Sequence, residues 1–143
     1  MHYLAWVVAA TELELRERLA PYNINSHQTE SCDCAPAQRC DPVCYINPQG
    51  KWDGWTIGGR WLEVFPSPEL SAAECLLGIR DGWPSTSERF PFSFVTESIW
   101  LDQEQWCGPE RGTVTTVDFD GKVSSLLEAV EPQARIYVVD YRR

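Results

Sequence analysis

The stretch "HYLAWVVAA" (residues 2–10) sets the fold expected for this chain. It is continuously apolar and rich in residues that favour β-structure, as is typical of a strand buried on both faces of a sheet. A similar stretch, "ARIYVVDY" (residues 134–141), closes the chain. Because both strands are this apolar, we expect them to lie side by side in the middle of the sheet.

Three segments between these strands carry helix signals. Thr11 and Glu14 form a capping-box pattern at the start of a first helix, and Pro21 ends it. The spacing of apolar residues predicts a second helix over residues 67–79 and a third over residues 120–130.

Shorter strand signals fill the rest of the chain. "RWLEVF" (60–65) predicts a strand, and "PFSFVTESIWLD" (91–102) predicts two short strands around a tight turn. Residues 112–119 form either a further strand or a loop. This order of elements predicts a single α+β domain over residues 1–143, a mainly antiparallel sheet with helices packed on one face. A ferredoxin-like arrangement is one way to satisfy it.

The charge composition of this chain argues against some classes of binding partner. There are 12 basic and 21 acidic residues, a formal net charge of −9, which argues against a nucleic-acid backbone or an anionic membrane surface as the main partner. A basic protein, including one that itself binds DNA or RNA, is compatible with this charge. No apolar run approaches the ~20 residues that span a bilayer. The N-terminal apolar stretch is better explained as a buried strand than as a signal sequence, so we expect a cytoplasmic protein.

Residues 23–46 form a polar, cysteine-rich insertion without the aliphatic periodicity of a packed core. Four thiols follow the spacing C-x-C-x5-C-x3-C, at Cys32, Cys34, Cys40 and Cys44. Because zinc prefers tetrahedral sulfur ligation, this cluster predicts a structural zinc site that orders the insertion. His27 could replace Cys34 as a ligand, and free thiols or disulfides are the alternatives to metal. Outside the cluster, Cys75 is predicted to be a small buried residue.

The stretch "NPQGKWDGWTIGGRW" (47–61) concentrates tryptophan, glycine and charge. We take its distinctive residues as the candidate ligand- or partner-binding site: Asn47, Lys51, Trp52, Asp53, Trp55, Gly58, Gly59, Arg60 and Trp61. In a pocket, the tryptophan faces would stack on a flat or cationic ligand while Arg60 or Lys51 meets an anionic group. The alternative is structural: a cluster of the three tryptophans, with an Asp53–Arg60 salt bridge that fixes the turn.

Catalytic signatures are sparse. The patterns G-x-S-x-G and H-E-x-x-H and the phosphate loop are absent, and the chain contains only 2 histidines. Lys51 and Asp53 form a conceivable acid–base pair, but neighbours of this kind are common on protein surfaces. Binding is therefore favoured over catalysis, and enzyme activity stays the less favoured alternative.

Four stretches together form a longer pattern: "LAPY" (19–22), the 47–61 motif, the hairpin ending in tryptophan at 92–100, and the "LL…P…VVD" of residues 126–140. This pattern resembles a family of uncharacterised small proteins from phage and prophage genomes, whose motif reads NP-x-x-KWDWY-x-x-GGRW. Some members carry a cysteine-rich, zinc-knuckle-like insertion at the corresponding place. This chain departs from the family at Gly54, where an aromatic residue is usual, which implies a different ligand preference if that ring lines a pocket.

Two functions follow from these patterns. The resemblance, the small size and the acidic charge predict a phage-type accessory protein that binds and inhibits a host protein, such as a defence effector or a nucleic-acid-handling protein. The alternative is a small-ligand or nucleotide binder, or an enzyme, with its site at residues 47–61. Neither the family resemblance nor the 47–61 motif predicts the oligomeric state.

Overall fold

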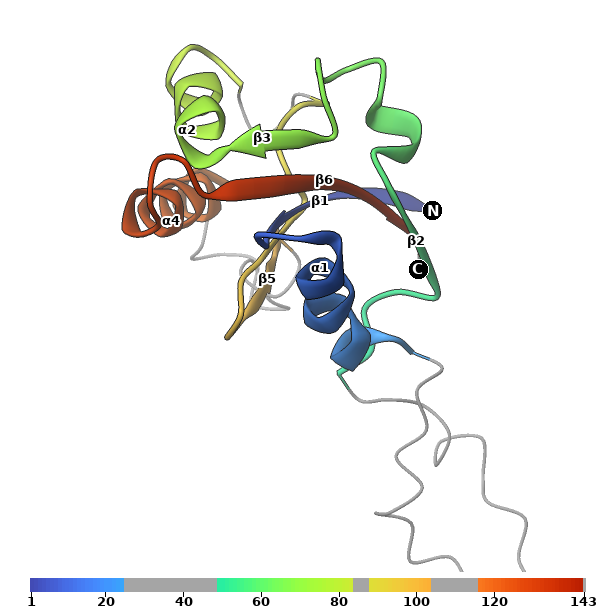
Figure 1. Cartoon of the computed structure of the whole chain (residues 1–143). Helices are drawn as coiled ribbons and strands as arrows, with labels where there is room; N and C mark the ends of the chain where they lie inside the picture. The colour runs from blue at the N-terminus through green and yellow to red at the C-terminus, as the bar shows by residue number, and fades with distance from the viewer. Residues whose placement is uncertain (25–48, 84–87, 104–115, 143) are drawn as a thin grey trace, which may run out of the picture.

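A computed structural model describes residues 1–24, 49–83, 88–103 and 116–142, with side chains in the last segment from Phe119 onward (Figure 1). Within these residues, six strands form one sheet in the order β2-β6-β1-β4-β5, and β3 pairs with β6 as well. The strands are β1 (His2–Val8), β2 (Gly54–Ile57), β3 (Glu69–Ser71), β4 (Ser93–Val95), β5 (Trp100–Asp102) and β6 (Arg135–Arg142). The helices are α1 (Glu12–Leu19), α2 (Ala72–Arg80) and α4 (Thr116–Ala129), with the short 3-10 helices η1 (Ala20–Tyr22) and η4 (Gly59–Trp61).

The first and last strands pair at the centre of the sheet, as predicted. β1 and β6 run antiparallel and pair over the whole length of β1. Leu4 and Trp6 enter one face of the sheet and Ala5 and Val7 the other, and all four side chains are buried. Because neither face of this strand meets water, its sequence has no polar alternation.

Helices cover both faces of the sheet, which corrects the prediction of a single covered face. Helices α2 and α4 pack on the face that contains Leu4 and Trp6. Helix α1 packs on the opposite face through Leu15 and Leu19 (Figure 1). The spacing of these leucines identifies the buried side of α1, but spacing within a helix carries no information about which face of the sheet receives it.

The α+β class is confirmed, and the sheet is mainly antiparallel with a parallel pair, β1 and β4, at its centre. Helices on both faces and this parallel pair together rule out the ferredoxin-like arrangement. The predicted hairpin is confirmed, since β4 and β5 pair antiparallel and the Thr96 N–H donates to the Ile99 carbonyl at 2.9 Å across the turn.

The strand predicted over residues 60–65 is wrong. Gly58 and Gly59 have φ values of 72° and 50°, a region that glycine adopts with little strain, and they turn the chain out of β2. The Trp61 N–H then donates to the Gly58 carbonyl at 3.0 Å and starts η4. Apolar residues at 61, 62, 64 and 65 resemble a strand in sequence, whereas the backbone hydrogen bonds are those of successive turns.

Two helix boundaries also differ from the predictions. The second helix begins at Ala72 rather than at residue 67, because residues 69–71 pair with β6 as strand β3. Helix α4 begins at Thr116, inside the segment predicted as a strand or loop. Its buried Phe119 and Val123 lie one turn apart, so packing outweighs the strand preference of the β-branched residues around it.

The side-chain cap predicted at Thr11 is present, although the Glu14 carboxylate binds the N–H of Ala10 rather than that of Thr11. The Glu14 N–H donates to Thr11 Oγ1 at 3.2 Å, and the Ala10 N–H donates to the Glu14 carboxylate at 2.8 Å. At the start of α2, Ser71 and Glu74 form a complete reciprocal capping box. Each cap satisfies backbone N–H groups that the first helical turn leaves without partners, which fixes where these helices start.

Cys75 is fully buried in α2, as predicted. Burial, with a smaller contribution from the Glu74 carboxylate, raises the pKa of its thiol well above the ordinary value. The thiol therefore stays protonated and acts as a small apolar residue. Among the described residues, no helix combines the length and the apolar character that crossing a membrane requires.

The two ends of the predicted 23–46 insertion lie side by side. The Lys51 N–H donates to the Tyr22 carbonyl at 2.6 Å, and the Ile24 N–H donates to the Trp52 carbonyl at 2.9 Å. The chain therefore leaves and re-enters the domain at one place. Residues 25–46 lie outside the described part of the chain.

Two helical glycines, Gly78 in α2 and Gly121 in α4, provide a matched test of how α2 packs. A Cβ at Gly78 would overlap the ring of Trp83, which packs against Trp6 and Phe65 in the core. Gly78→Ala should therefore destabilise the domain by about 1–3 kcal/mol. A Cβ at Gly121 would meet open space, so Gly121→Ala should stabilise it by about 0.5–1 kcal/mol. Urea unfolding measures both changes, and effects of the same sign would contradict the packing of α2 described above.

Candidate functional site

The turn between β2 and η4 divides the 47–61 motif between the two faces of the sheet. Trp52 and Trp55 lie on the α1 face, with their ring centroids 6.4 Å apart and their planes nearly perpendicular. Trp61 packs on the opposite face with the α2 and α4 core. The three tryptophans therefore do not form one cluster, and the motif contributes to two separate sites.

The first site is a groove of about 460 Å³ between β2 and α1, which we name the β2 groove. Its lining residues are Arg16, Trp52, Trp55, Thr56 and Ile57. The Trp52 indole N–H donates to the Leu19 carbonyl at 2.9 Å, which holds this ring against α1. The guanidinium carbon of Arg16 lies 5.4 Å from the centre of the Trp55 ring. Trp52 is thus a buried structural anchor, whereas Trp55 and Arg16 are the accessible part of the groove.

Gly54 marks an irregularity at the start of β2. Gly54 stands opposite Arg142 in the register, while the Asp53 N–H also donates to the Arg142 carbonyl, at 2.9 Å. Two consecutive residues opposite one partner are the signature of a β-bulge. The Arg142 guanidinium lies where a side chain at residue 54 would begin. An aromatic residue at this position would displace that guanidinium.

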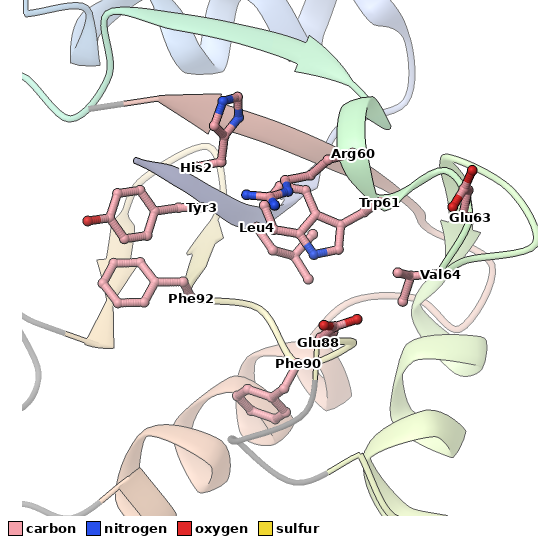
Figure 2. A pocket seen from close by; sticks show the side chains of 10 residues that line it. All are labelled: His2, Tyr3, Leu4, Arg60, Trp61, Glu63, Val64, Glu88, Phe90 and Phe92. Atoms are coloured by element: carbon pink, nitrogen blue, oxygen red, sulfur yellow. The ribbon is translucent and has the colours of Figure 1, made fainter.

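The second site is a pocket of about 480 Å³ between the start of β1, η4 and residues 88–92, which we name the β1 pocket (Figure 2). Its polar residues are His2, Arg60, Glu63 and Glu88. Its carbon-rich residues are Tyr3, Leu4, Trp61, Val64, Phe90 and Phe92. Only Arg60 and Trp61 come from the 47–61 motif, so most of this pocket was not predicted.

The carboxylate of Asp140 holds the β1 pocket together. Its Oδ1 accepts a hydrogen bond from His2 Nδ1 at 2.7 Å, and its Oδ2 accepts one from the backbone N–H of Arg60 at 3.1 Å. Gly59 lies so close to the Asp140 side chain that a Cβ there would overlap it. Asp140 therefore fixes the first residue of β1 to the start of η4. A single acid inside the apolar stretch "IYVVDY" was the sequence signal that could have identified it.

Lys51 lines neither site. Its ammonium lies 3.1 Å from the Asp102 carboxylate, and their side chains are 13% and 3% exposed. Ser93, the register partner of Asp102, shares a 2.7 Å hydrogen bond with the buried Tyr141 hydroxyl. Because this ion pair is enclosed by protein, Lys51 acts as a structural residue that joins the end of the insertion to β5.

The proposed Asp53–Arg60 salt bridge does not form, although the structure describes both residues. The Arg60 guanidinium carbon instead lies 5.6 Å from the centre of the Trp61 ring. Asp53 is exposed at the bulge before β2. Lys51 pairs with Asp102 instead of Asp53, so the conceivable Lys51–Asp53 acid–base pair does not form.

Asn47 and the four cysteines of the predicted zinc site, Cys32, Cys34, Cys40 and Cys44, lie outside the described residues. Within the described ranges, no group of three or more metal-ligating side chains comes together. Comparisons with models of protein families, with curated proteins and with solved structures found no match.

The ion pair in the sheet gives a stability prediction. Lys51→Met removes the ammonium and leaves the Asp102 carboxylate buried without it, so the free energy of unfolding should fall by about 3 kcal/mol. Lys122→Met is the control, because Lys122 forms no ion pair with any residue that the structure describes, and it should change stability by less than about 0.5 kcal/mol. Denaturant titration measures both, and equal losses would show that the pair contributes nothing specific.

Zinc at the cysteine cluster remains a prediction from the sequence. Native mass spectrometry of protein purified under reducing conditions without chelator should show one bound zinc, because four thiolates satisfy its tetrahedral shell. Cys40→Ser should lose that mass, whereas Cys75→Ala, which changes a buried core residue, should retain it. A metal-free mass for the unchanged protein, with all 6 cysteines as free thiols, would disprove the site.

Proposed function

We propose that this chain is a phage-type accessory protein that acts in the bacterial cytoplasm by binding and inhibiting a host protein, and that it docks through β2 and the β2 groove. The observation that carries the proposal is the position of β2 at the end of the strand order, beside accessible aromatic and cationic side chains. An edge strand of this kind can accept an extended segment of another protein as an additional strand.

The hydrogen-bonding pattern of β2 supports docking by strand addition. The Gly58 N–H donates inward to the Val138 carbonyl at 2.7 Å. In an antiparallel ladder, alternate residues direct their backbone groups to the same side. The N–H groups of Trp55 and Ile57 therefore point away from β6, toward the side where a new strand would pair.

The charges beside β2 indicate what the incoming strand carries. Arg16 lies over Trp55, and the Arg142 guanidinium lies over Gly54. Neither arginine forms an ion pair with a described residue, whereas Arg18, Arg80 and Arg135 each pair with a glutamate. We therefore expect a carboxylate on the partner strand at the position that meets Arg16.

The net charge of the whole chain acts over a longer range than these contacts. A net charge of −9 favours encounter with a basic protein, such as one that handles nucleic acid. Encounter and docking are separate steps, so a partner with a basic surface and one acidic edge strand satisfies both.

The test compares variants of the docking edge in bacteria. The chain should raise the plating efficiency of a phage that a host defence system restricts. Ile57→Pro removes an outward N–H, a change that an edge strand tolerates, and it should abolish both this effect and recovery of the partner that co-purifies with the unchanged chain. Arg16→Glu should weaken recovery by roughly tenfold, because it places like charges in contact.

Arg80→Glu is the matched control, because Arg80 is an exposed arginine on α2, away from β2. It should recover the partner as well as the unchanged chain does. Urea unfolding of every variant separates lost docking from lost folding. If well-folded Ile57→Pro and Arg16→Glu proteins both retain the partner, the docking surface lies elsewhere.

A further inference from the structure

We infer that the β1 pocket binds a small ampholyte, a molecule with a carboxylate or phosphate at one end, an amine or other N–H donors at the other, and a flat apolar body between them. This site is independent of the proposed docking edge. Trp52 and Trp55 of the β2 groove pack on the α1 face of the sheet, whereas Leu4, Trp61 and Phe90 of the β1 pocket belong to the apolar cluster on the opposite face.

The anion-binding end is formed by Arg60, with His2 beside it. The Arg60 guanidinium forms no ion pair with any residue that the structure describes, and the residue is exposed. Asp140 accepts from His2 Nδ1, so the other imidazole nitrogen is left for a ligand. Asp140 also holds the backbone of Arg60, so one buried carboxylate positions both side chains. A guanidinium held in this way suits a carboxylate or a phosphate.

The donor-binding end is formed by Glu88 and Glu63, which line the same pocket. Neither carboxylate pairs with a described cation, although Arg60 lines the pocket with them. Figure 2 shows the carboxylate of Glu88 across from Arg60, with Trp61 and Leu4 between them. Opposite charges that share a pocket without meeting favour a ligand that carries the complementary charges at its two ends.

The middle of the pocket is apolar. Leu4, Phe90 and the half-buried Trp61 ring provide hydrophobic and aromatic contacts between the charged ends. Small-ligand sites combine apolar contacts with polar groups that fix orientation, and they have volumes of roughly 300–1,000 Å³. In this pocket the polar groups make up the larger part of the accessible lining. The volume of about 480 Å³ fits a ligand the size of an aromatic amino acid or a nucleoside monophosphate.

Two series of probes test the shared chemistry and separate its sources. In the first series, AMP is compared with adenosine, which lacks the anion, and with ribose 5-phosphate, which lacks the flat body and its amine. In the second, 4-(aminomethyl)benzoate is compared with benzylamine and 4-methylbenzoate, which each lack one charge. Isothermal titration should show one-to-one binding of AMP or of 4-(aminomethyl)benzoate, at least roughly tenfold tighter than both of its analogues.

Variants assign the two ends of the pocket. Arg60→Gln should weaken the preferred ampholyte by at least roughly tenfold and leave its anion-free analogue unchanged, because that analogue does not contact the guanidinium. Glu88→Gln should weaken the same ampholyte and leave the amine-free analogue unchanged. Arg80→Gln, on the exposed surface of α2, should change none of these affinities.

Binding of AMP assigns the pocket to nucleotides, and binding of 4-(aminomethyl)benzoate assigns it to aromatic amino acids whose charges lie at opposite ends of the ring; both support the inference. It is overturned if neither probe binds saturably up to about 5 mM, a concentration above the Kd expected even of weak small-ligand complexes. It is also overturned if Arg60→Gln and Glu88→Gln leave the affinity of the bound probe unchanged. Since these assays contain no protein partner, their outcome does not depend on the docking surface.

Discussion

The structure depends on the pairing of β1 with β6, which joins the two ends of the chain. Every residue of β1 faces a residue of β6 in register, and β6 also pairs with β2 and β3. Both faces of this central pair are buried, and each of the two apolar clusters contains residues from both strands. Strand β6, which is synthesised after the other strands, is therefore required before β1, β2 and β3 can join one sheet. Contacts so distant in sequence make the formation of this sheet entropically demanding.

Local signals in the sequence predicted the elements that short-range physics determines. The cap at Thr11 satisfies the first turn of its helix wherever that helix packs, and the two short strands around a tight turn in residues 91–102 pair with each other as a hairpin. What could not be predicted were arrangements that depend on distant residues. Strand β3 exists because β6 pairs with it, and the face that α1 covers follows from the path of the chain after β1.

The candidate site shows the same distinction between local and distant information. The 47–61 motif was singled out as the candidate site, with the glycines at 58 and 59 among its residues. Their effect, however, is to place the two halves of the motif on different faces of the sheet. The backbone of Arg60 is held by a hydrogen bond to Asp140, which lies 80 residues away in the sequence. Lys51 is similarly held by Asp102, 51 residues away. No spacing within the motif indicates that Asp140 lies beside Arg60 or that Asp102 lies beside Lys51.

The hydrogen bonds that join Tyr22 and Ile24 to Lys51 and Trp52 have a consequence for how this domain can change. They fix the distance between the two ends of the cysteine-rich segment from within the domain. Closing a loop whose ends are already held costs only about 0.6 kcal/mol more for each doubling of its length. In terms of closure entropy, a change in the length of this segment therefore costs the domain little. In this respect the domain is a scaffold with an interchangeable part, and chains that share its core are free to differ at this one place.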